Sequence, residues 1–102
     1  MMKLVIVTAV RVFHKNVINL FREAGIENFS ESDIDGHKNT NGLIIVSNWF
    51  GGEGGGNESN MFFSFTEENR IDKLFTLIKD FNANLETNNP IRAVVVPIEK
   101  FI

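Results

Sequence analysis

Two β-branched runs near the ends of the chain constrain its fold more than any other feature. Residues 3–10 read KLVIVTAV and residues 91–98 read IRAVVVPI, and both runs are apolar with few interruptions. A strand of this kind carries apolar side chains on both faces, which is typical of a strand inside a sheet that is covered on both sides. Two faces of a sheet therefore need cover, from this chain or from another.

Two segments between these runs have the periodicity of amphipathic helices. In residues 14–24 the apolar positions fall on one side: Val17, Leu20, Phe21 and Ala24. Gly25 follows as a left-handed helix stop. A second stripe predicts a helix over residues 67–82: Ile71, Leu74, Phe75, Ile78 and Phe81.

The remaining segments complete an alternating order of elements. Residues 29–35 and 61–65 are predicted strands, and residues 43–50 form a further extended stretch. The order strand, helix, strand, excursion, strand, helix, strand predicts one α+β domain over residues 1–102. Its architecture is a ferredoxin-like βαββαβ sandwich, an antiparallel sheet with two helices on one face.

Two helices cover only one face of such a sheet. On the other face the apolar side chains of residues 3–10 and 91–98 would meet water, and the chain has no spare helix to shield them. Another subunit is the obvious cover. We therefore expect a homo-oligomer.

Composition excludes several classes of protein. A net charge of −3 argues against a nucleic-acid binder, which would carry a basic face. The chain has no cysteine, so it has no disulfide, thiolate zinc site or thiol nucleophile. The apolar run that ends before Arg11 is too short to span a bilayer and lacks a small-residue cleavage site. We expect a cytoplasmic protein without direct membrane insertion.

Glycine is concentrated in one loop. Residues 48–59 read NWFGGEGGGNES, which holds five of the eight glycines directly after the only tryptophan. The segment lacks the lysine of a P-loop and is not followed at once by a helix, so a phosphate cradle is not predicted. It is either a flexible hairpin tip or a mobile recognition loop. In the second case Trp49, Phe50 and Glu53 are the candidate contacts to a protein partner.

Few residues are suited to catalysis. The chain has no tyrosine or cysteine, so the acid-base candidates are His14, His37 and scattered carboxylates. A metal site would combine the histidines with acids such as Asp33, Asp35 or Glu53, but no HxH or HExxH spacing supports one. The simpler interpretation is two solvated histidines in loops or turns. We predict no catalytic residue, no metal site and no enzyme.

The chain resembles the PII-like signal-transduction proteins. Residues 3–38 follow that family's opening, a strand, a short turn and a helix ending in EAGI (23–26), then a strand ending in Gly36. The excursion at about 37–60 has the place and approximate length of the family's flexible T-loop. VVVPIEK (94–100) looks like its last core strand, so the resemblance covers nearly the whole chain.

This resemblance implies a homotrimer whose sheets face each other around a central axis, which would supply the missing cover. It also implies a non-enzymatic regulator that senses small effectors, commonly adenine nucleotides, in clefts between subunits. Such a regulator controls a transporter, an enzyme or a transcription factor through the T-loop. By this resemblance the cleft would involve Gly36, Lys38 and Arg92, and the partner-facing loop would be residues 48–59.

The sequence also departs from the family pattern. The turn before the last strand, residues 88–92, has no glycine, and Arg92 stands where the family has a lysine. Lys38 replaces a glycine at the base of the T-loop, and the absence of tyrosine excludes tyrosyl uridylylation. The effector is therefore open: an adenine nucleotide, another small molecule, an ion, or none.

Two other classes of protein have a similar order of elements. A CutA-like trimer associated with divalent metal would use His37, Glu53 or Glu58 as ligands. A small enzyme of the dimeric α+β barrel kind would use His14 or His37 as its acid-base group, with Trp49 lining a pocket. A trimer with a packed centre would count against the second class.

Overall fold

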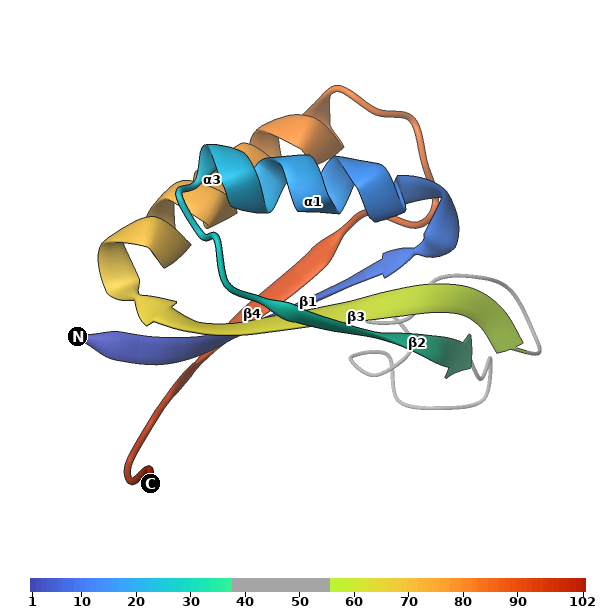
Figure 1. Cartoon of the computed structure of the whole chain (residues 1–102). Helices are drawn as coiled ribbons and strands as arrows, with labels where there is room; N and C mark the ends of the chain where they lie inside the picture. Colours follow the sequence, from blue (N-terminus) through green and yellow to red (C-terminus); the bar gives the residue numbers. More distant parts are fainter. Residues whose placement is uncertain (38–55) are drawn as a thin grey trace.

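The computed structural model describes residues 1–37 and 56–102. The elements are β1 (Met2–Val10), the 3-10 turn η1 (Arg11–Phe13), α1 (His14–Glu23), β2 (Ser30–His37), β3 (Gly56–Glu67), α3 (Glu68–Ala83) and β4 (Arg92–Pro97). The strands form one antiparallel sheet in the order β2-β3-β1-β4, and both helices lie on the same face of it (Figure 1). The predicted α+β ferredoxin-like sandwich is confirmed.

The predicted boundaries agree with the structure to within two residues, with one exception. The third strand was expected over residues 61–65, whereas β3 begins at Gly56 and ends at Glu67. It is longer because β3 pairs with β2 on one side and with β1 on the other, and this pairing holds polar residues such as Asn60 in the strand. The extended stretch expected at 43–50 lies outside the described residues.

The core lies between the helices and the sheet. Val5 and Val7 of β1 and Phe62 of β3 are fully buried, as are Phe21 of α1 and Leu74 of α3. The neighbouring residues of β1 point to the opposite face because side chains alternate along a strand. The two helices therefore close one face of the sheet and leave the other to its surroundings.

Gly25 ends α1 as the sequence predicted. Its φ is +80°, in the left-handed region that favours glycine. The Gly25 N–H donates to the Arg22 carbonyl at 3.0 Å, and the Ile26 N–H donates to the Phe21 carbonyl at 2.9 Å. This is the pair of hydrogen bonds of a Schellman motif, and Ile26 is buried just after it. The motif turns the chain from α1 toward β2.

Contacts between the start of β1 and the start of α3 join the two elements. The Lys3 ammonium donates a hydrogen bond to the Glu68 carboxylate at 2.9 Å. That hydrogen bond and the charge of Lys3 lower the pKa of Glu68. The N-terminal ammonium contacts Glu67 at 3.0 Å. Because these groups are exposed, the contacts orient the segment more than they stabilise it.

One asparagine fixes the connection from α3 to β4. The Asn82 Nδ2 donates to the Ile91 carbonyl at 2.9 Å, and the Ile91 N–H donates to Asn82 Oδ1 at 3.0 Å. The side-chain amide thus forms one donated and one accepted hydrogen bond with the Ile91 backbone, as a residue of a neighbouring strand would. Ile91 is buried, so this pairing sets where β4 begins beside β1.

We predict that Asn82→Ala lowers the free energy of unfolding by about 1–3 kcal/mol, because it leaves the Ile91 N–H and C=O without their partner. Urea denaturation followed by circular dichroism measures the change. Asn88→Ala, at an exposed position of the same connection, is the matched control and should change stability by less than about 0.5 kcal/mol. Equal effects of the two substitutions would contradict this role of Asn82.

Candidate functional site

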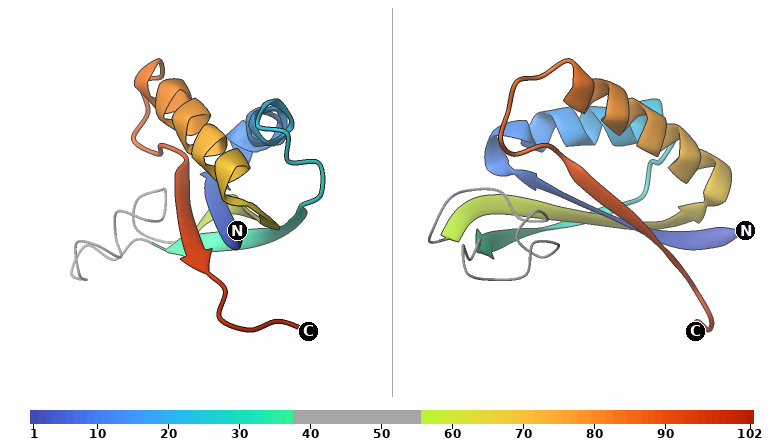
Figure 2. Two further views of the ribbon diagram at one scale, coloured as in Figure 1. Left: turned by 90° about the vertical axis from the view of Figure 1, so that its left-hand side faces the viewer. Right: turned by 180° about the vertical axis from the view of Figure 1, so that it is seen from behind.

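The face of the sheet that points away from the helices is open and apolar. Figure 2 shows α1 and α3 on one side of the sheet only. By the alternation along the strands, the large apolar residues of this open face include Leu4, Ile6, Met61, Phe63, Phe65, Val94 and Val96. Phe65 is 57% exposed, and Val94 and Val96 are 36% and 37% exposed. No described element covers the part of this face around Phe65, Val94 and Val96, as the sequence predicted. Thr8 and Ser59 lie on the same face by register but are only 7% and 5% exposed.

Gly36 and Arg92 lie on opposite edge strands of the sheet. Arg92 of β4 is level with Thr8, Met61 and Ser32 across the sheet, whereas Gly36 lies four residues beyond Ser32 along β2. Three strand spacings of about 4.8 Å and four residues of about 3.4 Å put the two positions roughly 20 Å apart. Both belong to the open face by their register, but Gly36 is buried. One chain therefore does not bring these two predicted cofactor-binding residues together.

The other predicted site residues lie outside the described residues. These are Lys38, at the base of the long excursion, and the predicted partner contacts Trp49, Phe50 and Glu53. Their roles stay predictions. The described ends of the excursion are His37, the last residue of β2, and Gly56, the first residue of β3, which pair with each other. The excursion therefore leaves and re-enters the sheet at the same end as Gly36.

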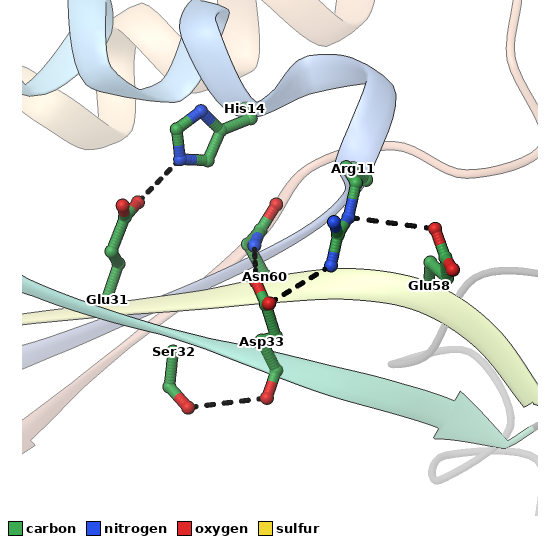
Figure 3. Close-up of polar contacts among 7 residues, drawn as sticks. All are labelled: Arg11, His14, Glu31, Ser32, Asp33, Glu58 and Asn60. Atoms are coloured by element: carbon green, nitrogen blue, oxygen red, sulfur yellow. Dashed lines mark hydrogen bonds and ion pairs between the residues drawn. The ribbon is translucent and has the colours of Figure 1, made fainter.

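A cluster of charged and amide side chains lies on the helix side of this same end (Figure 3). The Arg11 guanidinium is 3.2 Å from Asp33 and 3.7 Å from Glu58. Asn60 Nδ2 donates to Asp33 Oδ1 at 2.8 Å. Asp33 and Asn60 are partners in the register of β2 and β3, so the strand pairing itself brings them together.

Sequence reasoning missed this cluster, although one signal for it was present. Glu31, Asp33 and Asp35 alternate along β2, so their carboxylates share the face that looks toward the helices. A basic residue, Arg11, directly follows β1. Arg11 and Asn60 were not singled out, because the partner of each depends on a register that the sequence pattern does not reveal.

His14 is not a solvated loop residue. It is the first residue of α1, its side chain is 34% exposed, and its Nε2 lies 2.6 Å from the Glu31 carboxylate. Its ring lies beside Phe62, with centroids 5.7 Å apart. His37, by contrast, is exposed at the end of β2. Nowhere in residues 1–37 and 56–102 do three or more His, Asp or Glu side chains form a group suited to hold a metal ion.

Asn60 lines a cavity at the start of α1. The cavity has a volume of about 440 Å³, and its lining residues are Arg11, Val12, His14, Lys15, Asn16, Asp33 and Asn60. Asn60 is only 4% exposed, and its Oδ1 receives no hydrogen bond from any residue that the structure describes. A buried acceptor in this state costs about 1–3 kcal/mol. Asn60 is therefore a poor choice for stability alone.

A second cavity lies at the other end of β2. It has a volume of about 380 Å³ and is lined by residues 27–30 and 63–65. Ser64 Oγ donates to the Asn28 carbonyl at 2.6 Å, which holds the segment before β2 against β3. The lining combines the rings of Phe29, Phe63 and Phe65 with polar side chains. Aromatic rings beside a few polar groups suit a flat heterocyclic ligand.

None of the described helices combines the length and apolar character needed to cross a lipid bilayer.

No protein-family model matches the sequence, and no curated protein matches it. The fold itself, however, has well-matched counterparts among solved structures.

CPII, a nitrogen regulatory PII-like protein from Thiomonas intermedia K12 bound to ADP, AMP and bicarbonate, has a TM-score of 0.62 at 12% identity, over 99% of this chain and 96% of its own. A DUF3240 family protein from Shewanella baltica OS155 has a TM-score of 0.67 at 17% identity, over 98% of this chain and 92% of its own. A protein from Thermus thermophilus described as a PII-like signalling protein has a TM-score of 0.51 at 13% identity, over 94% of this chain and 89% of its own. The resemblance to PII-like proteins is thus confirmed for the fold.

We predict that Asn60→Leu leaves the free energy of unfolding unchanged or raises it by about 1 kcal/mol, because it removes a buried acceptor without a partner and keeps the branched shape of the side chain. Asp33, which loses one hydrogen bond, is exposed and can turn to water. Urea denaturation tests this prediction. Destabilisation of more than about 2 kcal/mol would show that Asn60 is primarily a structural residue.

Proposed function

We propose that this chain is a divergent PII-like regulatory protein that works as a cytoplasmic homotrimer. In this proposal it senses a small effector in clefts between subunits and controls a partner protein through its glycine-rich loop. The observation that carries the proposal is the uncovered apolar face of a sheet whose fold matches that of PII-like proteins. We do not assign it an enzymatic activity.

Physical chemistry favours assembly through the open face. Phe65, Val94 and Val96 are all more than a third exposed, and they belong to one continuous surface across β3, β1 and β4. A single domain of 102 residues is near the lower end of comfortable stability, so burial of this surface would add a substantial fraction of its free energy of unfolding. The resemblance to PII-like proteins favours three copies around an axis.

Assembly also offers a way to complete the effector site. Gly36 and Arg92 are too far apart to share a small ligand within one chain, yet both lie on the open side at the two edges of the sheet. In a ring of subunits one edge of each sheet approaches the other edge of the next. We therefore place the cleft where Gly36 and Lys38 of one copy meet Arg92 of a neighbour.

An adenine nucleotide is the leading candidate for the effector. CPII, whose fold this chain matches, was solved with ADP and AMP. An arginine such as Arg92 binds phosphate through paired N–H donors even where the glycine-rich turn is absent. The departures at residues 88–92 leave other small anions as candidates.

The effector would act on the loop through its base. The excursion starts after His37 and returns at Gly56, and Gly36 and Lys38 flank that start. A ligand bound there has different contacts for different loop arrangements, which is what shifts a population between them. Trp49, Phe50 and Glu53 would then contact the partner protein, such as a membrane transporter or an enzyme.

No specific observation favours the two alternative classes. For a CutA-like metal site, Glu58 would have to leave its ion pair with Arg11. For an enzyme of the dimeric α+β barrel kind, His14 would have to leave Glu31. The remaining candidate ligands and pocket residues of both classes are His37, Glu53 and Trp49. Of these, the structure describes only His37, which is exposed.

We predict that light scattering gives a mass of about three times the 11.5 kDa of one chain. Phe65→Asp should shift this mass toward the monomer, because a charge would be buried in the proposed interface. Val12→Asp is the matched control, since Val12 is 77% exposed on η1, away from the open face. A monomeric wild-type protein, or a Phe65→Asp variant with unchanged mass, would contradict the proposed assembly.

We predict that ADP, AMP or ATP raises the melting temperature of the wild-type protein in a thermal-shift assay. A ligand at one hundred times its Kd stabilises a protein by about 2.7 kcal/mol. Arg92→Ala and Lys38→Ala should each reduce the shift strongly, whereas Lys79→Ala, an exposed control on α3, should not. A trimer indifferent to these nucleotides would remove the nucleotide from the proposal but leave the assembly.

A further inference from the structure

The cavity at the start of α1 contains a buried acceptor that needs a donor. The Asn60 amide cannot be turned over, because its Nδ2 donates to Asp33 Oδ1 at 2.8 Å and the reverse orientation would set two oxygens against each other. Its Oδ1 therefore faces away from Asp33, and no donor in the described part of the chain reaches it. In Figure 3 the Asn60 amide lies between β2 and the start of α1. Asn60 lines the cavity, but Oδ1 itself has almost no accessible surface. A ligand with an N–H group would supply the missing donor once the side chains around Oδ1 shift to admit it.

The same cavity has a positive side. Neither η1 nor α1 has a side-chain cap at its first residue, and neither has an acidic residue in its first turn. The N-terminal partial charge of the helix is thus not balanced by any residue of its own first turn. Lys15 lines the cavity and forms none of the ion pairs found among the described residues. This side favours an anionic group.

Asp33 supplies a negative charge beside the buried acceptor. Its carboxylate already accepts from Asn60 and pairs with Arg11. Two carboxylate oxygens offer about four acceptor positions, so capacity for a further donor is left. Asp33 and Asn60 therefore form an acceptor side of the cavity, and Lys15 and the start of α1 form its donor side.

We propose that this cavity binds a free α-amino acid. The ligand's ammonium group would donate to Asn60 Oδ1 and Asp33, and its carboxylate would face Lys15 and the first backbone amides of the helix. The cavity of about 440 Å³ has room for a small amino acid. A zwitterion is the simplest small molecule that satisfies both sides at once.

Other ligand classes fit less well. A simple anion would pair with Lys15 but leave Asn60 Oδ1 without a donor. A metal ion would compete with the Arg11 guanidinium, which already contacts both Asp33 and Glu58. The site is formed within one chain on the helix side of the sheet, so it depends neither on the proposed trimer nor on the cleft at Gly36 and Arg92.

Nuclear magnetic resonance of the ¹⁵N-labelled full chain tests the proposal. Each of the twenty common amino acids is titrated at millimolar concentrations, and at least one should shift the amide signals of residues 11–16 and 58–61. Matched analogues of that amino acid, one without the carboxylate and one without the amine, should each bind at least roughly tenfold more weakly, as the loss of one charged contact implies. If no amino acid shifts these signals, or if either analogue binds equally well, the proposal is overturned.

Substitutions assign the binding to this cavity. Lys15→Gln, at an exposed position, should weaken binding at least roughly tenfold, and Lys79→Gln on α3 is the control that should not. Asn60→Leu should abolish binding while the spectrum keeps its folded dispersion. Wild-type affinity in Lys15→Gln would overturn the proposal, whether or not Asn60→Leu folds.

Discussion

The structure depends on one imbalance, a central strand that is apolar on both faces beside helices that cover only one. β1 pairs with β3 and β4, so it can be shielded only from above and below the sheet. Val5 and Val7 are fully buried beneath the helices, whereas Leu4 and Ile6 on the other face are only half-buried. The helix side is closed within the chain. The open side is the surface through which we propose that copies assemble, and the proposed effector clefts lie between those copies.

The order of elements and the uncovered face could be predicted from the sequence because both depend on local periodicity. α1 and α3 are strongly amphipathic, and Gly25 marks the end of the first. The length of β3 was underestimated, because pairing on both sides can hold polar residues in a strand that their propensity does not favour. The length of β3 is therefore set by its pairing with β1 and β2 and not by its local sequence.

The polar cluster near α1 could not be predicted for a different reason. Asn60 and Asp33 are 27 positions apart in the sequence, and they meet only through the register of β2 and β3. A change of one residue in the register of β2 on β3 would send Asp33 to the open face and separate it from Asn60. The separation of Gly36 from Arg92 is also a property of strand order rather than of sequence pattern. Sequence periodicity predicts which face of a single helix or strand is apolar. A site also depends on how two or more of these elements are placed relative to each other.

The two edges of the sheet differ in how they are protected. β2 carries three acidic residues on an outer strand, which discourages another strand from adding to it. β4, at the other edge, offers Val94, Val95 and Val96, with only the proline at its end as a break. A newly made chain therefore exposes an edge strand that can pair with other strands, together with an apolar face. In the proposed trimer, assembly of new chains would compete with aggregation through these surfaces. The rate at which copies meet would then affect how much assembled protein forms.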